Sequence, residues 1–273
     1  MDALTLNNGV LRLAVAPQGA SVLHLESLKH NRPILYGAQQ ALFPMLPLAN
    51  RVAGNAFTLH GEKIALPSSP VDERFFLHGD GWLQRWTVEQ QSGEAITLSC
   101  ASRYDCGFDY AARLHYRLVD NALHAELALT HHGRKMMVYG LGFHPFFQLQ
   151  PDSRVQFSAS GYWPEGEHHL PLAWQDTLPS AVDFTTPVKP ADTWLNVGYS
   201  GWSGCALIED AQMQVKLTSE APWLMVFRQP GKPFICLEPQ THPVNAHNLT
   251  GMPGLRALQQ GEATTLKMVI QVN

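Results

Sequence analysis

Apolar and polar residues alternate with a period of two along much of the chain, and this pattern constrains the fold more than any other feature. Successive side chains of a β-strand point to opposite faces, so the alternation predicts strands with one buried face. In residues 111–118, the apolar face carries Ala112, Leu114, Tyr116 and Leu118. The opposite face carries arginine and histidine. The chain should therefore fold mainly through strands that are half buried.

A second alternating stretch at 122–130 follows directly, and Asp120 with Asn121 supplies turn-forming residues between the two. The pair predicts a β-hairpin. Further alternating stretches lie at 154–160, 212–218 and 264–272, and β-rich runs with less regular faces lie at 10–16, 95–101 and 223–227. No stretch shows a convincing amphipathic helical period. The 21 glycines and 19 prolines punctuate short strands, which is typical of a sandwich or barrel.

The chain has 273 residues, and all-β domains commonly reach about 250 residues without splitting. It contains no internal repeat, low-complexity tract or linker, so we expect residues 1–273 to form one domain. The longest weakly patterned stretch runs from about 161 to 203 and should hold most of the irregular loop. Loops of that length are usually functional or mobile.

Charge and composition narrow the classes of partner. Hydrophobic residues make up 45% of the chain, charged residues only 15%, and the net charge is −4. Without a dense run of Lys or Arg, the chain lacks the features of a nucleic-acid binder or of a protein that binds anionic membranes. It also lacks a signal sequence and an apolar run long enough to span a bilayer, so we expect a cytoplasmic protein with a neutral small ligand.

The four cysteines form no CxxC pair; they are Cys100, Cys106, Cys205 and Cys236. Three lie in apolar, strand-like runs, where a free thiol behaves as a small hydrophobic side chain. We interpret all four as reduced and structural, since only an oxidising compartment would favour disulfides.

Four clusters place polar residues in apolar or glycine-rich surroundings. The central residues of these clusters are Arg51, His78, His144 and Glu238. A proline follows both His144 and Glu238, and proline cannot donate to a sheet ladder. We therefore expect a strand to stop at each of these two residues. Strand ends and their loops are where functional sites are commonly built.

Each of these residues also has an ordinary structural explanation when taken alone. Arg51 fits a surface ion pair, His78 a turn cap, and His144 a hydrogen-bonded core histidine. Glu238 is harder to explain in this way. It leaves an apolar strand, where a carboxylate must be paired or functional.

Taken together and in this order, the clusters resemble the aldose 1-epimerase family, the galactose mutarotases. The resemblance begins at residues 6–27, with a glycine turn at Gly19, and spans nearly the whole chain. It continues through the motifs at 50–66, 77–82, 140–149 and 236–248. It implies an all-β fold, a large twisted antiparallel β-sandwich, in agreement with the alternation.

The resemblance also implies roles: Glu238 as general base, His144 as general acid, and Arg51 and His78 holding sugar hydroxyls or the ring oxygen. Interconverting anomers requires a proton to leave the anomeric hydroxyl while another reaches the ring oxygen. The C1–O5 bond opens, the aldehyde rotates, and the ring closes again. A carboxylate and an imidazolium on opposite sides of the anomeric carbon would suffice, each contributing about 10²–10⁴-fold. The expected partner is a small-molecule sugar, and no metal or organic cofactor is needed.

The segment at 194–204 departs from the family pattern. Where the family usually has an aspartate that binds sugar hydroxyls, this chain has Asn196. The preferred sugar therefore need not be galactose. Trp82, Phe146 and Trp202 are candidates for stacking on a sugar ring, and we include Trp202 with Asn196 among the expected substrate-binding residues.

Two other enzyme classes fit the sequence less well. A glycoside hydrolase needs a second carboxylate beside Glu238, and Asp80 is the best candidate. A metal hydrolase could draw on the 13 histidines. However, the pairs 131–132 and 168–169 are adjacent in sequence, so on a strand they would point to opposite faces.

Two alternatives remain open within the resemblance. One is a noncatalytic sugar-binding or sugar-sensing protein that keeps the pocket without the chemistry. Retention of both His144 and Glu238 weighs against it. The other is a phosphosugar epimerase, which would need additional cationic residues at the rim, and only Arg74 lies near a motif.

Overall fold

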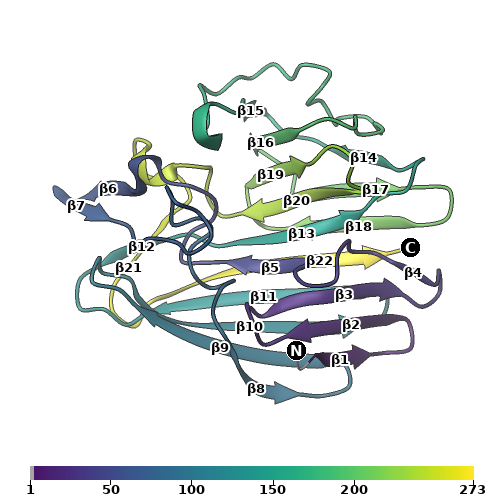
Figure 1. Cartoon of the computed structure of the whole chain (residues 1–273), viewed down its shortest axis with the longest axis horizontal. Coiled ribbons are helices and arrows are strands. Elements are labelled where there is room, and N and C mark those ends of the chain that lie inside the picture. Colours follow the sequence, from purple (N-terminus) through teal and green to yellow (C-terminus); the bar gives the residue numbers. More distant parts are fainter. Residues whose placement is uncertain (1–2) are drawn as a thin grey trace.

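The structure, a computed structural model, describes residues 3–273 and is built almost entirely from antiparallel strands in two large sheets (Figure 1). The first sheet has ten strands. In spatial order they are β1 (Leu4–Asn7), β2 (Leu11–Ala16), β3 (Ser21–Ser27), β5 (Leu42–Met45), β13 (Gly142–Gln148), β20 (Phe234–Gln240), β19 (Trp223–Arg228), β16 (Leu195–Ser200) and β15 (Gly161–Trp163), with β4 (Arg32–Pro33) paired to β3.

The second sheet has eight strands. In spatial order they are β14 (Arg154–Phe157), β17 (Cys205–Glu209), β18 (Gln214–Ser219), β22 (Ala263–Val272), β11 (Ala122–His131), β10 (Asp109–Val119), β9 (Ala95–Arg103) and β8 (Thr87–Gln91). Two small two-stranded antiparallel pairs lie outside both sheets: β6 (Ala56–Leu59) with β7 (Glu62–Ala65), and β12 (Met137–Tyr139) with β21 (Arg256–Leu258). The helical segments within residues 3–273 are three short 3₁₀ turns: η1 (Ala53–Asn55), η2 (Glu167–His169) and η3 (Ala246–Asn248).

The predicted hairpin is confirmed as β10 and β11, joined at Asp120 and Asn121. Its apolar positions face each other in the core: Leu114 pairs with Leu127, which in turn pairs with Leu266 of β22. All three leucines are buried. Period-2 patterning therefore builds the row of side chains that fills the space between the sheets. The predicted all-β antiparallel architecture is confirmed.

The segment at 161–203 is only partly irregular. It begins with β15 and ends with β16, and these two strands pair at the edge of the first sheet. The chain between η2 and β16 has no helix or strand of its own and arches over the upper edge of the molecule in Figure 1. This arch carries residues that line the functional site.

The four cysteines are free thiols, as expected. Within residues 3–273, no helix is long and apolar enough to cross a membrane.

Candidate active site

His144 and Glu238 lie inside neighbouring strands, so the expectation that a strand stops at each of them is wrong. On β13 and β20, Gly142 pairs with Gln240, and Phe146 pairs with Cys236. The same register places His144 directly opposite Glu238. The prolines that follow them interrupt the ladder locally, because each lacks an N–H, but both strands continue.

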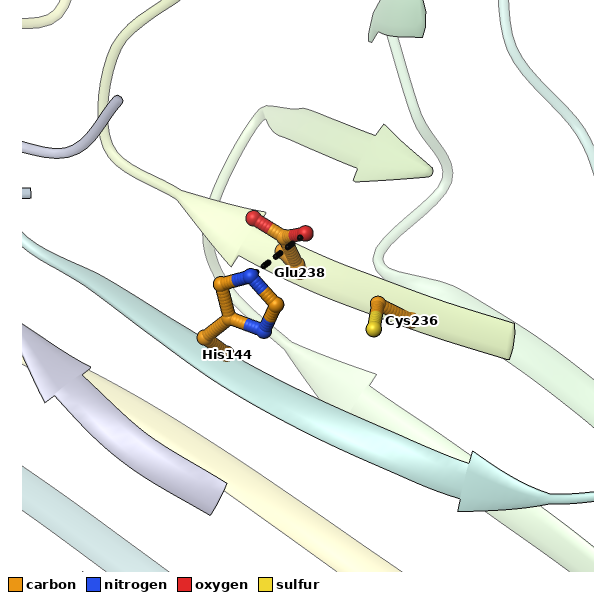
Figure 2. A group of neighbouring side chains, drawn as sticks. All are labelled: His144, Cys236 and Glu238. Atoms are coloured by element: carbon orange, nitrogen blue, oxygen red, sulfur yellow. Dashed lines mark ion pairs between the residues drawn. The ribbon is translucent and has the colours of Figure 1, made fainter. Parts of the chain in front are cut away.

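The imidazole of His144 and the carboxyl of Glu238 point toward one another from these two strands (Figure 2). His144 Nε2 lies 3.2 Å from Glu238 Oε1. The rings of Phe43 and Phe146 stack on the imidazole, each with a centroid separation of 4.6 Å. These contacts fix the imidazole plane and exclude water from it. Burial, with a smaller contribution from the charge of Arg51, lowers the pKa of His144 to about 3.

The carboxyl group of Glu238 is almost completely buried. Burial raises its pKa to about 8, although a hydrogen bond from Gln240 and the charge of Arg51 both oppose this shift. Gln240 Nε2 donates to Glu238 Oε2 at 3.2 Å. With one pKa raised and the other lowered, Glu238 and His144 hold a single proton between them at neutral pH.

His144 and Glu238 lie side by side on adjacent strands, because the register of β13 and β20 makes them cross-strand neighbours. The expected placement of this acid and base on opposite sides of a sugar carbon stays a prediction.

His78 and Arg51 lie on two loops that hydrogen bonds join to each other. The backbone N–H of Asn50 donates to His78 Nδ1 at 3.0 Å, and the backbone N–H of His78 donates to the Asn50 carbonyl at 3.0 Å. A backbone N–H can only donate, so Nδ1 is the acceptor and the neutral ring carries its proton on Nε2. Burial, followed by the nearby His144 and Arg51, lowers the pKa of His78 well below its ordinary value. His78 therefore offers an Nε2–H donor.

Gly79 allows these two loops to approach. Its backbone has φ +69, and a Cβ at this position would collide with the carbonyl oxygen of Leu46. The backbone N–H groups of Asp80 and Gly81 both donate to that same carbonyl, at 3.1 and 3.2 Å. The glycine in the motif at 77–82 thus holds His78 against the loop that carries Arg51.

Arg51 projects its guanidinium group toward the buried pair. Its Nη1 donates to Asn50 Oδ1 at 3.2 Å, while its buried Nε has no hydrogen-bond partner among the described residues. Burial lowers the pKa of Arg51, whereas the negative charges of Asp72, Glu238 and Glu165 raise it. An arginine remains charged under any ordinary condition, so it places a positive charge with unused donors beside Glu238.

A cleft of about 170 Å³ brings together five of the six predicted site residues: Arg51, His78, His144, Asn196 and Glu238. Four further residues also line it and were not predicted: Asn50, His169, Trp194 and Phe227. Three of these four lie on the arch at 161–203 or on the strand beside it. The length of that irregular segment was the only sequence signal for His169 and Trp194.

Trp202 does not belong to this group. The chain turns at Gly201, where φ is +60, and the Trp202 side chain is buried in the core with its Nε1 donating to the Cys205 carbonyl at 3.0 Å. Trp194, which is 45% exposed, is the tryptophan that lines the cleft. Trp82 and Phe146 support the site from behind, since Trp82 stacks on Phe43 and Phe146 on His144.

Asp80 does not act as an acidic partner of Glu238. Its buried carboxylate accepts hydrogen bonds from Tyr110 at 2.5 Å, Tyr104 at 2.8 Å and Ser102 at 2.5 Å, and also from Gln84. It does not line the cleft. These contacts give the Asp80 carboxylate a structural role. They exclude Asp80, which was the best candidate for the second acid of a glycoside hydrolase.

The adjacent histidines also lie outside a shared metal site. His131 is buried, with Nδ1 beside the Tyr139 hydroxyl and Nε2 beside the Lys135 carbonyl. His168 and His169 lie in a 3₁₀ turn rather than on a strand. Among residues 3–273, one group has three metal-ligand side chains within 4.8 Å of one another: His144, Cys236 and Glu238 (Figure 2). Burial raises the pKa of the Cys236 thiol well above its ordinary value, which disfavours the thiolate that a metal requires.

Comparison with known proteins identifies the family and the fold. A model of the aldose 1-epimerase family matches residues 2–271. The chain belongs to the aldose 1-epimerase family. Within it, the uncharacterized protein YphB of Escherichia coli (strain K12) is 32% identical over 290 residues, covering 100% of this chain and 99% of that protein.

Solved structures of other proteins share the fold of this aldose 1-epimerase family member. A crystal structure of a provisionally assigned aldose 1-epimerase from Escherichia coli K12 superposes with a TM-score of 0.94 at 32% identity, covering 99% of this chain and 98% of that one. A galactose mutarotase-like protein from Clostridium acetobutylicum gives a TM-score of 0.88 at 17% identity, covering 99% and 95%. A galactose 1-epimerase from Lactobacillus acidophilus NCFM gives 0.81 at 17%, covering 99% and 94%.

Proposed function

We propose that the protein is an aldose 1-epimerase that interconverts the α and β anomers of a free aldose by general acid–base catalysis. The observation that carries the proposal is the buried Glu238–His144 pair, which faces a cleft and holds one proton. The cleft is smaller than the roughly 300–1,000 Å³ typical of pockets for drug-sized ligands, as suits a single sugar ring.

The shared proton supports the following cycle. At neutral pH the pKa shifts place the proton on Glu238, so the cycle begins when this proton passes to His144 across their 3.2 Å contact. Glu238 then accepts the proton of the anomeric hydroxyl as His144 donates a proton to the ring oxygen, and the C1–O5 bond breaks to give the open aldehyde. After rotation about C1–C2, the C5 hydroxyl attacks the other face of the aldehyde. The C5 hydroxyl returns its proton to His144 as Glu238 protonates the new anomeric oxygen. The pair holds one proton before and after each step.

In this cycle, Arg51 and His78 bind the sugar oxygens that lie around the Glu238–His144 pair. Both offer only donors toward the cleft, the guanidinium of Arg51 and the Nε2–H of His78, so each suits a sugar oxygen that accepts. Donors already in place where negative charge develops stabilise the transition state more than water does.

The test is the rate of anomer exchange of free aldohexoses, followed by NMR magnetisation exchange or polarimetry with and without the protein. We expect exchange above the uncatalysed rate for at least one sugar, and no change after treatment with a chelator, because the proton pair needs no metal. Activity that disappears with chelator and returns with a divalent ion would contradict the mechanism. Sugar binding by calorimetry without exchange would instead identify a noncatalytic sugar-binding protein.

A sugar phosphate fits the site less well than a free sugar. Arg74 is exposed and does not line the cleft, and the carboxylates of Asp72 and Glu165 lie close enough to Arg51 to raise its pKa. These negative charges would repel a phosphate near the only arginine of the cleft. Inclusion of glucose 6-phosphate in the sugar panel tests this expectation.

The pH dependence follows from the raised pKa of Glu238. Below about 8 the pair holds its proton, and above about 8 it loses it, so no acid remains to protonate the ring oxygen. We expect kcat/KM, corrected for the uncatalysed rate at each pH, to be flat between about pH 5 and 7 and to fall about tenfold per unit above 8. A corrected kcat/KM that rises through pH 8 would show that the unprotonated pair is the active form.

A further inference from the structure

Glu165 lies directly beside Asn196, outside the set of residues that the sequence singled out. On β15 and β16, Trp163 pairs with Gly198. The same register, continued past Pro164, places Glu165 opposite Asn196. This arrangement parallels the His144–Glu238 pair, where a proline also interrupts the ladder beside two opposed side chains.

The carboxylate of Glu165 accepts three side-chain hydrogen bonds. Asn196 Nδ2 and His169 Nδ1 donate to Oε1 at 2.6 and 2.5 Å, and Trp194 Nε1 donates to Oε2 at 2.7 Å. Burial opposes ionisation of Glu165, but these hydrogen bonds outweigh it and lower its pKa. A carboxylate that can only accept therefore fixes the orientation of three donors.

All three donors line the cleft, whereas Glu165 lines a smaller neighbouring cavity that shares Asn196 and His169 with it. The carboxylate thus lies behind the wall that these side chains form. Asn196 is also held by β16, where it pairs with Phe227 of β19. The Trp194 ring makes an edge contact with the Phe227 ring at 5.2 Å, and the His169 ring lies 5.7 Å from that of Trp194. His169 lies in η2, and the chain between η2 and β16, which carries Trp194, contributes no strand or helix.

We propose that Glu165 is a positioning residue that determines sugar specificity, by holding Asn196, His169 and Trp194 as one wall of the cleft. The proposal rests on the proposed function for its kinetic consequences. Its structural core, the three hydrogen bonds to one carboxylate, can be tested without any sugar.

The orientation of Asn196 follows from this contact. In a planar amide, the nitrogen and oxygen lie on opposite sides, so an Nδ2 that donates to Glu165 turns Oδ1 away from it. Asn196 then serves the cleft chiefly as a hydrogen-bond acceptor, which selects a sugar hydroxyl that donates.

The first experiment is Glu165→Gln, with Glu167→Gln as the matched control. Glu167 lies two residues away. Its side chain is 88% exposed and forms an ion pair with His168. In Glu165→Gln, one of the three donors must face an amide N–H instead of an oxygen. We expect KM for the preferred sugar to rise about tenfold while kcat changes less than about threefold, because the wall binds substrate without moving protons. Glu167→Gln should leave both constants unchanged.

The second experiment exchanges the carboxylate and the amide between positions 165 and 196. Asn196→Asp places a second carboxylate against Glu165, and like charges at this separation repel or take up a proton. We expect KM to rise at least about a hundredfold. The double variant Glu165→Gln, Asn196→Asp restores one carboxylate and one amide in the opposite order, so KM should return to within about tenfold of the wild type. The ratio of kcat/KM for glucose and galactose should shift in the double variant, since the acceptor at position 196 now carries a charge.

A sugar-free measurement separates failure of this proposal from failure of the proposed function. The indole N–H signal of Trp194, assigned by its absence in Trp194→Phe, should move upfield in Glu165→Gln and stay in place in Glu167→Gln. An unmoved signal, an unchanged KM in Glu165→Gln, or a double variant no better than Asn196→Asp would each overturn the proposal. If the wild type binds sugar without exchange, dissociation constants replace KM. If it does neither, the proposed function and the specificity role both fail, whatever the indole signal shows.

Discussion

Glu238→Gln is expected to lower kcat for anomer exchange by at least about a hundredfold, because glutamine cannot take up the proton of the anomeric hydroxyl. The substitution keeps the shape of the side chain, and its amide can still contact His144 and Gln240. Protein stability should therefore be preserved or improved. The raised pKa of Glu238 means that burial penalises its charged form. The resulting loss of stability grows as the pH rises from about 4.5 to about 8 and is complete above about 8, and the neutral amide removes it.

The measurement is magnetisation exchange at a saturating sugar concentration, combined with thermal unfolding at pH 7 and pH 9. Glu126→Gln is the matched control, since Glu126 is an exposed residue on β11 of the other sheet. We expect wild-type exchange in the control. Near-wild-type kcat in Glu238→Gln would mean that the site is misassigned.

His144→Ala is expected to reduce kcat by a similar factor, at least about a hundredfold, because it removes the group that protonates the ring oxygen. The imidazole packs beside the rings of Phe43 and Phe146, so its removal leaves a cavity next to two aromatic rings. Imidazole added to the solution should enter this space and restore part of the activity. Such recovery distinguishes lost proton transfer from a general disturbance of the site.

Two further variants control for collapse of the cavity that His144→Ala leaves. His144→Gln keeps much of the volume and a polar end but has no ring to carry the proton, and it should show the same loss without recovery by imidazole. His124→Ala, an exposed position on β11, should retain full activity. An His144→Ala protein that remains folded and exchanges anomers at the wild-type rate would exclude His144 as the acid.

The structure places five of the predicted site residues around one cleft: Arg51, His78, His144, Asn196 and Glu238. Their catalytic and binding roles stay predictions. The sequence marked them because each is a polar side chain in surroundings that do not explain it. Trp202 was wrong for a related reason. An indole near a motif is apolar enough for the core, and the turn at Gly201 sends it there.

Glu165 and His169 could not be predicted in the same way. They lie on a segment without periodicity, and their importance comes from what they contact rather than from their neighbours in sequence. Glu165 meets Asn196 across 31 positions of chain through the register of β15 and β16. No local pattern reports which residue a loop carboxylate will face.

The sequence by itself determined that this protein is an all-β sandwich, because the alternation of apolar and polar residues is a local consequence of strand geometry and of burying one face. It also marked Arg51, His78, His144, Asn196 and Glu238 as candidates for the proposed chemistry. The tertiary structure was needed to show that His144 and Glu238 are cross-strand neighbours, and that Glu165 accepts hydrogen bonds from Asn196 and Trp194. The physical reason is that strand register and desolvation depend on residues distant in the chain, so the pKa shifts and hydrogen bonds of the site exist only once both sheets are assembled.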